Sequence, residues 1–251
     1  MQNIISPVPA RLTKALYIPK HDDTSPHFAI YDISEEYSEK VGVNPMGSEL
    51  YKVQLALLRK PNGYFAGDNA RFLVDVGASV SIRERVIGRD PCEAEVASPI
   101  DGGRNVAVQL YAGGSSFQLD AHEIYLLPEK ETKKRIVRYP YMSTTGTFGS
   151  SGAVRYEWQV HPVEKGPLRY ELVDLQRQVD DDGKILAIYH HHGFENDLPT
   201  SYSSGVLLLP ATSTPLFEIM AASSLIALLS TVRKQPAPKK QSRLRSFMAS
   251  L

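Results

Sequence analysis

Three consecutive histidines, His190, His191 and His192, are the residues in this sequence best suited to binding a metal ion. Imidazole is the commonest ligand for transition metals, and on a strand His190 and His192 would share a face. Glu195 or Asp197 would be available from the following loop. A structural metal site needs further ligands at a clear spacing, and none is written nearby. We therefore predict a solvated, histidine-rich strand end with no metal, and we expect no cofactor.

Residues that act as covalent nucleophiles lack their usual partners in this sequence. The run Gly149 to Gly152 is one residue short of the Gly-x-Ser-x-Gly elbow and lies in a predicted loop rather than between a strand and a helix. Cys92 has no basic neighbour closer than Arg89, so nothing marks it as an activated thiolate. No catalytic signature is present, although an acid–base pair assembled in space would leave no spacing to read.

The overall composition indicates a globular chain without disulfide bonds. The 251 residues include 28 basic and 28 acidic side chains and one cysteine, which excludes a disulfide-framed scaffold. The first residues, from Met1 to Pro7, show no pattern of a signal or transit peptide, so we expect a cytoplasmic protein. Zero net charge argues against a nucleic-acid partner held by the field of the whole molecule.

The zero net charge hides a basic C-terminal tail. Six bases and no acid follow Val232, which leaves 22 bases against 28 acids before it, a net charge of −6. One alternative is a disordered, solubilising end. The other is a weak peripheral contact with an anionic membrane, at about 1 kcal/mol per basic residue near the surface. The tail residues that would make this contact are Lys239, Lys240, Arg243, Arg245 and Phe247.

Short apolar runs separated by turn formers predict an all-β domain. The segment Val154 to Val160 alternates apolar and polar residues, as a strand with one buried face does. No helical segment separates the runs, which excludes a parallel α/β fold. Gly146–Gly152 is predicted to be a loop. The predicted strands are 15–18, 28–33, 51–58, 71–76, 79–83, 106–111, 116–119, 135–141, 154–160, 168–174, 185–189 and 205–209.

One helix is predicted near the C-terminus, from Pro215 to Lys234. Thr214 is suited to the N-cap, Pro215 to the first helical position and Glu218 to the positive end of the helix dipole. The helix is apolar all round, so either protein or a bilayer must surround it. A membrane tail anchor is one alternative. The small residues of the helix favour the other, a core element enclosed by strands.

The order of these elements resembles the tubby C-terminal-like superfamily, which includes tubby proteins, phospholipid scramblases and LURP-one-related proteins. The local motifs are most similar to small fungal tubby-like proteins of unknown role. They are the segments 53–61, 156–158, 169–174 and 183–189, followed by the helix. The resemblance implies a closed antiparallel β-barrel of about twelve strands with one hydrophobic helix, 215–234, threaded through its centre. Residues 1–14 would form an extension, 15–234 the tubby-like barrel and 235–251 the tail.

The resemblance also directs attention to basic pairs at alternate strand positions, which tubby uses to bind phosphoinositide head groups. Two groups have this spacing, although neither aligns with tubby's residues: Arg83 with Arg85, and Lys133 with Arg135 and the nearby Arg138. Such pairs face the same side and can grip one phosphate. They are lipid-binding candidates, or charges that keep the barrel wall soluble.

We therefore expect a non-catalytic binding or scaffold module that acts on lipid head groups, membrane surfaces or a protein partner. The alternative is a small-molecule-binding barrel, or an enzyme, that takes a hydrophobic metabolite of a specialised pathway. Its pocket would lie at the barrel mouth and be lined by tyrosines such as Tyr139, Tyr141 and Tyr156.

Overall fold

The computed structural model describes residues 8–19, 21, 27–41, 70–76, 80–86, 90–97, 106–112, 115–126, 140–147, 153–161, 168–177, 183–191 and 205–234. The elements in these ranges, in chain order, are β1 (Lys14–Ile18), β2 (His27–Asp32), α1 (Ser34–Val41), β3 (Ala70–Val76), β4 (Val80–Glu84), β5 (Glu93–Ala97), β6 (Val106–Ala112), β7 (Ser115–Leu126), β8 (Pro140–Thr147), β9 (Ala153–His161), β10 (Leu168–Asp174), β11 (Ile185–His191), β12 (Gly205–Leu209) and α3 (Pro215–Lys234).

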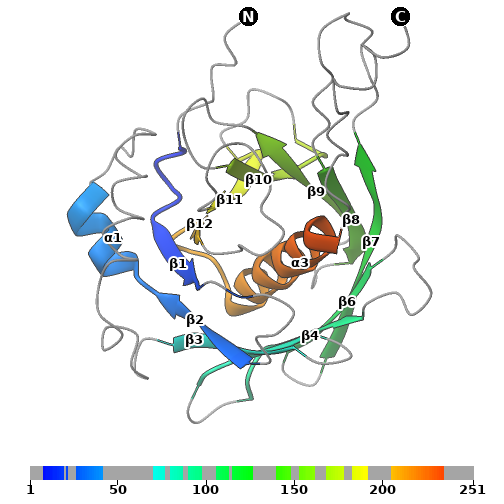
Figure 1. The fold of residues 1–251 in the computed structure, drawn as a ribbon, viewed down its shortest axis with the longest axis horizontal. Helices are drawn as coiled ribbons and strands as arrows, with labels where there is room; N and C mark the ends of the chain where they lie inside the picture. Colours follow the sequence, from blue (N-terminus) through cyan, green and yellow to red (C-terminus); the bar gives the residue numbers. More distant parts are fainter. Residues whose placement is uncertain are drawn as a thin grey trace, which may run out of the picture.

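The strands pair antiparallel in the order β1-β12-β11-β10-β9-β8-β7-β6-β5-β4-β3-β2, and β2 pairs again with β1. Leu16 of β1, for example, lies opposite Leu207 of β12 on one side and Asp32 of β2 on the other. The strands surround α3 as the wall of a barrel (Figure 1). The predicted class is confirmed: the chain is mainly β and antiparallel, with one hydrophobic helix near its C-terminus.

Helix α3 forms the core, and it begins where the sequence predicts. The Phe217 backbone N–H donates to Oγ1 of Thr214 at 3.3 Å, so Thr214 is the N-cap. Every side chain from Ile219 to Leu229 is buried. Burying each large apolar side chain contributes about 1.5–3 kcal/mol, so this helix is a major source of stability. No helix in the described part of the chain is both long and apolar enough to cross a membrane.

A second, smaller cluster lies outside the barrel wall. Four residues pack over the outward side chains of β1, β11 and β12. They are Val8 and Leu12 of the N-terminal segment, Ile33 just before α1, and Tyr37 within α1. The covered residues are Ala15, Tyr17, Ile188, Val206 and Leu208. These strands are therefore apolar on both faces, which explains why their sequences do not alternate.

Three local predictions differ from the structure. Helix α1 and strand β5 were not predicted, because α1 is short and charged and the apolar residues of β5 are small. Gly146 was placed in a loop but lies in β8, opposite Val154 of β9. The predicted strand 51–58 and residues 135–139 of another lie outside the described residues.

Candidate functional site

Arg83 and Arg85 lie on the outside of the barrel at the end of β4, on the same side of the strand. Both side chains are exposed, and Glu84 between them is buried, as strand alternation requires. Nε of Arg83 forms an ion pair with Oε1 of Glu93 on β5 at 2.7 Å. The charge of Arg83 is thus partly balanced within the wall. Lys133, Arg135 and Arg138 lie outside the described residues.

Arg83 belongs to a row of outward side chains that crosses four strands. Strand register places Leu73 of β3 opposite Arg83, Arg83 opposite Glu93, and Glu93 opposite Tyr111 of β6. Leu73 and Tyr111, at the two ends of this row, are 44% and 41% exposed. We call these four residues the LREY row. Tyrosine and arginine are enriched at protein interfaces, which makes this row a candidate binding surface.

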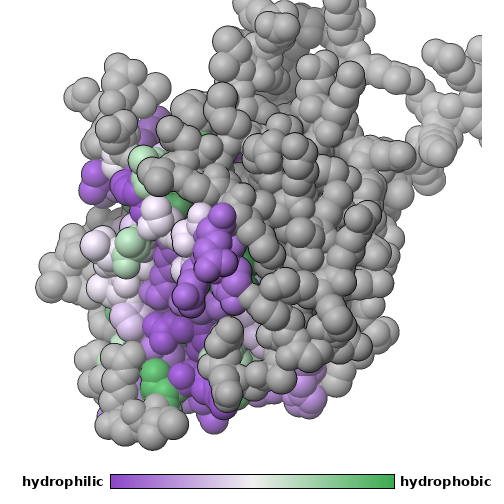
Figure 2. Space-filling view, turned by 90° about the vertical axis from the view of Figure 1, so that its left-hand side faces the viewer, coloured by the Kyte–Doolittle hydropathy of each residue, from purple (hydrophilic) through white to green (hydrophobic). Residues whose placement is uncertain are grey.

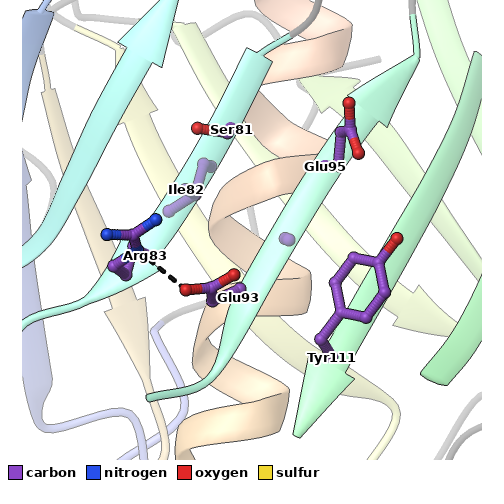
Figure 3. Close-up of a pocket in the computed structure, with 7 residues that line it drawn as sticks. Ser81, Ile82, Arg83, Glu93, Glu95 and Tyr111 are labelled. Atoms are coloured by element: carbon purple, nitrogen blue, oxygen red, sulfur yellow. Dashed lines mark ion pairs between the residues drawn. The ribbon is translucent and has the colours of Figure 1, made fainter. Parts of the chain in front are cut away.

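A parallel row lies one pleat away, and a depression connects the two. In this second row Asp75 of β3 is opposite Ser81 of β4, Ser81 is opposite Glu95 of β5, and Glu95 is opposite Gln109 of β6. The depression has a volume of about 90 Å³. Its lining residues are Ser81, Ile82, Arg83, Glu93, Ala94, Glu95 and Tyr111. Figure 3 shows the depression on the outer face of β4, β5 and β6, with α3 behind the sheet.

The chemistry of this wall is recognition by polar and aromatic groups. It offers a guanidinium, carboxylates, a hydroxyl and a phenol ring within three adjacent strands. These groups can donate and accept hydrogen bonds and can stack against a partner's side chains. On the neighbouring side of the molecule, over α1, β2 and β3, the described surface is mostly hydrophilic with isolated apolar residues (Figure 2).

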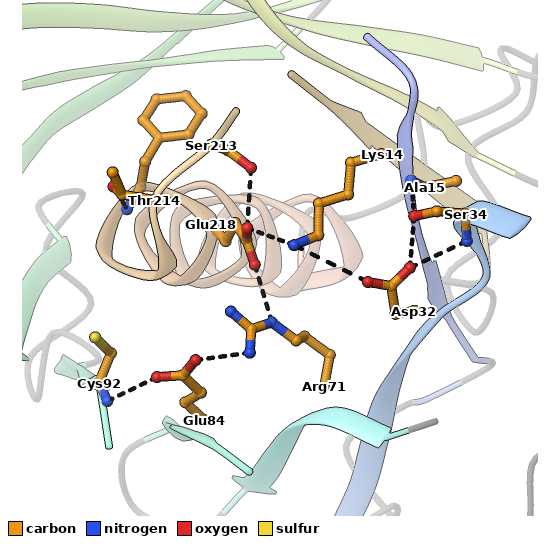
Figure 4. A network of polar contacts seen from close by, with 11 residues as sticks. Lys14, Ala15, Asp32, Ser34, Arg71, Glu84, Cys92, Ser213, Thr214 and Glu218 are labelled. Atoms are coloured by element: carbon orange, nitrogen blue, oxygen red, sulfur yellow. Dashed lines mark hydrogen bonds and ion pairs between the residues drawn. The ribbon is translucent and has the colours of Figure 1, made fainter. Parts of the chain in front are cut away.

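A buried polar network holds the first turn of α3 to the barrel wall (Figure 4). Glu218, 1% exposed, accepts from Nζ of Lys14 at 2.6 Å and from Nε of Arg71 at 3.0 Å. Ser213 also donates to Glu218, at 2.9 Å. Arg71 in turn pairs with Oε1 of Glu84 at 2.6 Å. Although burial lowers it, the carboxylates of Glu218 and Glu84 raise the pKa of Arg71 above its ordinary value.

This network links β1, β3 and β4 to the first turn of α3. The sequence places Glu218 at the positive end of the helix dipole but does not reveal its partners. One feature of the sequence could have indicated a buried polar network: Glu84 occupies an inward strand position, two residues after the buried Ile82. A carboxylate at an inward position needs a buried partner, but the sequence alone does not say which one.

The prediction of a solvated, histidine-rich strand end is wrong for the two histidines that the structure describes. His190 and His191 are both buried in β11, at 5% and 2% exposure. Burial and the nearby Arg169 lower the pKa of His190 to about 3. His191 packs with Tyr170 and Tyr189, with ring centroids 5.9 Å apart in each pair. Both imidazoles are thus enclosed by protein rather than by the expected solvent, and for His191 the enclosing groups include two tyrosine rings.

The structure describes only some of the remaining predicted residues. His192 and the tail residues Lys239, Lys240, Arg243, Arg245 and Phe247 lie outside the described residues, as does Tyr139. Tyr141 belongs to β8, and the half-buried Tyr156 of β9 packs against the core. The backbone N–H of Cys92, the single cysteine of the sequence, donates to Oε2 of Glu84 at 3.2 Å. No group of three metal-ligating side chains converges within the described part of the chain.

Comparison with known proteins adds no relative. No protein-family model matches the chain, and no curated protein or solved structure matches it at a significant level.

Proposed function

We propose that the protein is a non-catalytic binding or scaffold module that works through the outside of its barrel. The observation that carries this proposal is the burial of α3 from Ile219 to Leu229 among the inward side chains of the strands. A barrel filled by its own helix has little interior volume for a substrate. Its outer wall, with the LREY row and the depression beside it, is then the surface available for binding.

The finer architecture that we propose is a closed barrel of about twelve strands, with helix 215–234 as its permanent core rather than as a membrane anchor. The antiparallel order that runs from β1 round to β2 supports closure. The network around Glu218 supports a permanent core, because it ties the helix to three strands. We also propose a distant relationship to the tubby C-terminal-like superfamily, supported by the order of strands followed by an enclosed helix.

The proposed partners are an anionic lipid or a protein, and the proposed location is cytoplasmic or at a membrane surface. A lipid head group would be bound by Arg85, by the group Lys133, Arg135 and Arg138, and by the basic tail. The pairing of Arg83 with Glu93 makes Arg83 itself a weaker anion ligand, since a phosphate would have to compete with a carboxylate at 2.7 Å.

The alternative, a barrel or enzyme for a hydrophobic metabolite, requires a pocket that reaches Tyr139, Tyr141 and Tyr156. Tyr156 packs against the core cluster that includes α3, which argues against an open mouth at this position. We therefore rank this alternative second.

Liposome flotation tests the lipid form of the proposal. The full chain is mixed with phosphatidylcholine vesicles that contain or lack a phosphoinositide. We expect flotation only with the phosphoinositide, and less of it in the variants Lys133→Glu/Arg135→Glu and Lys239→Glu/Lys240→Glu. The double reversal Arg177→Glu/Lys184→Glu, outside both groups, is the matched control. Equal flotation of all variants, or none with wild type, would contradict lipid binding. A metabolite that accumulates in a deletion strain would instead favour the alternative.

A further inference from the structure

The two outward rows on β3 to β6 have a pattern that is complementary to itself. A second copy can be generated by a two-fold axis that lies over the sheet, parallel to the strands and midway between β4 and β5. Rotation by a half turn about this axis places β4 against β5 of the second copy, and β3 against β6. It keeps each row facing the same row of its partner, because positions along the strands do not change.

Every position in the LREY row then meets a complementary residue. The order across the strands is Leu73, Arg83, Glu93 and Tyr111. Reversing this order places each guanidinium over a carboxylate of the other copy, and each leucine over a phenol ring. The contact would then have two ion pairs at its centre and apolar contacts on both sides, and the matched charges would fix the register and exclude other partners.

The second row behaves in the same way. Its order is Asp75, Ser81, Glu95 and Gln109. Under the same rotation the Ser81 hydroxyl faces the Glu95 carboxylate of the other copy, and the Gln109 amide faces the Asp75 carboxylate. Each contact pairs a donor with an acceptor, and no two like charges are opposed.

We propose that the β3–β6 wall is the interface of a two-fold symmetric dimer, and that its occupant is a second copy of this chain. The self-complementarity matches the isologous interface that two-fold symmetry requires, in which each residue meets the residue that meets it in return. Two sheets that pack face to face lie about 10 Å apart, close enough for these side chains to interdigitate. A barrel wall is convex, so the contact centres on β4 and β5.

This inference rests on the proposed function only in using the outside of the barrel as the binding surface. It specifies the protein partner, and it removes Arg83 from the list of lipid ligands in the dimer. Its readout is the mass of the particle in solution, which is independent of vesicle flotation.

Charge reversal tests the dimer. Analytical ultracentrifugation of the full chain across a dilution series should show reversible dimerisation. Arg83→Glu opposes two carboxylates across the axis, and Glu93→Arg opposes two guanidinium groups. We expect each variant to dimerise at least about tenfold more weakly than wild type. Arg177→Glu is the matched control and should associate as wild type does, because Arg177 is an exposed arginine that also pairs with a carboxylate of its own chain but lies after β10, outside both rows.

Two rescues separate broken contacts from broken folding. An equimolar mixture of the Arg83→Glu and Glu93→Arg proteins should form a heterodimer, because carboxylates then face guanidinium groups at both positions. The double variant Arg83→Glu/Glu93→Arg should regain self-association, since its reversed row is again self-complementary. Thermal melts of each protein verify that it is folded.

A wild-type protein that stays monomeric across the series would overturn the proposal. Single reversals that dimerise as wild type does, or reversals that neither mixing nor the double variant rescues, would also overturn it. A monomer that still floats with phosphoinositide vesicles would reject the dimer and leave the lipid form of the proposed function standing.

Discussion

Replacing Glu218 by glutamine is the most direct test of how α3 is held in the barrel. The side chain is 1% exposed and accepts from Lys14, Arg71 and Ser213 at 2.6, 3.0 and 2.9 Å. Glutamine keeps the size of the side chain but removes its charge. It also turns one accepting oxygen into a donor that faces a cation.

The structure sets the magnitude of this loss. Breaking a buried ion pair by removing one partner costs about 3–5 kcal/mol. Lys14 and Arg71 are each 19% exposed, and each keeps a second carboxylate, Asp32 at 4.0 Å or Glu84 at 2.6 Å. We therefore expect the lower end of the range, about 3 kcal/mol, which lowers the melting temperature by roughly 6–12 °C in a domain of this size.

Urea denaturation monitored by tryptophan fluorescence measures this loss. Trp158 is the single tryptophan, is fully buried and donates to Ser224 of α3 at 2.9 Å, so its emission reports on the helix in place. Glu39→Gln removes the same charge from the exposed face of α1 and should change stability by less than about 0.5 kcal/mol. Glu218→Gln with an equally small effect would refute the reasoning. Lys14→Met should also cost less in the Glu218→Gln background than in wild type, because both changes break the same contact.

Three further predictions concern single buried residues. Ser224→Ala should cost about 1–3 kcal/mol in urea denaturation, because it leaves the indole N–H of Trp158 without its acceptor. Ser223→Ala removes a hydroxyl that donates to the Met220 carbonyl of its own helix, so it should cost less, and equal losses would contradict a role for the indole contact. Gly205→Ala should cost about 3 kcal/mol in the same assay, because a Cβ there would lie 2.7 Å from a tyrosine ring carbon and closer still to a backbone oxygen; near-neutrality would refute this packing. The pKa of His190 is lowered to about 3 from 6.5, so the unfolded chain binds this proton first, and the free energy of unfolding should fall as pH drops from 6.5 towards 3, by at most about 1.4 kcal/mol per pH unit. His190→Gln should flatten that slope in urea titrations at several pH values, and an unchanged slope would contradict the burial of a neutral imidazole.

The elements with strong local signals were predictable from sequence. Helix α3 begins and ends at the predicted residues, because the N-cap, the first-turn proline and the last-turn cations all act within a few residues of the helix ends. Strand β12 likewise has its predicted bounds. Helix α1 was missed because its stability depends on Tyr37, which packs over β1 and β12, rather than on a long apolar stripe.

The candidate binding surface was not predictable in the same way. Arg83 and Arg85 were identified as a pair because two residues on one strand have a fixed separation. The partner of Arg83, Glu93, is on another strand, and nothing in the sequence states which residues of two strands lie opposite each other. The register of β4 against β5, and of β5 against β6, brings the LREY row together.

By itself the sequence determined the class of fold, the single apolar helix and the contrast between an acidic body and a basic tail, because periodicity, capping and charge are local or additive properties. Only the tertiary structure decided what surrounds that helix, which cations neutralise Glu218, and that His190 and His191 are buried. The physical reason is that burial and pairing depend on strand register and on the side chains that distant segments bring to each face.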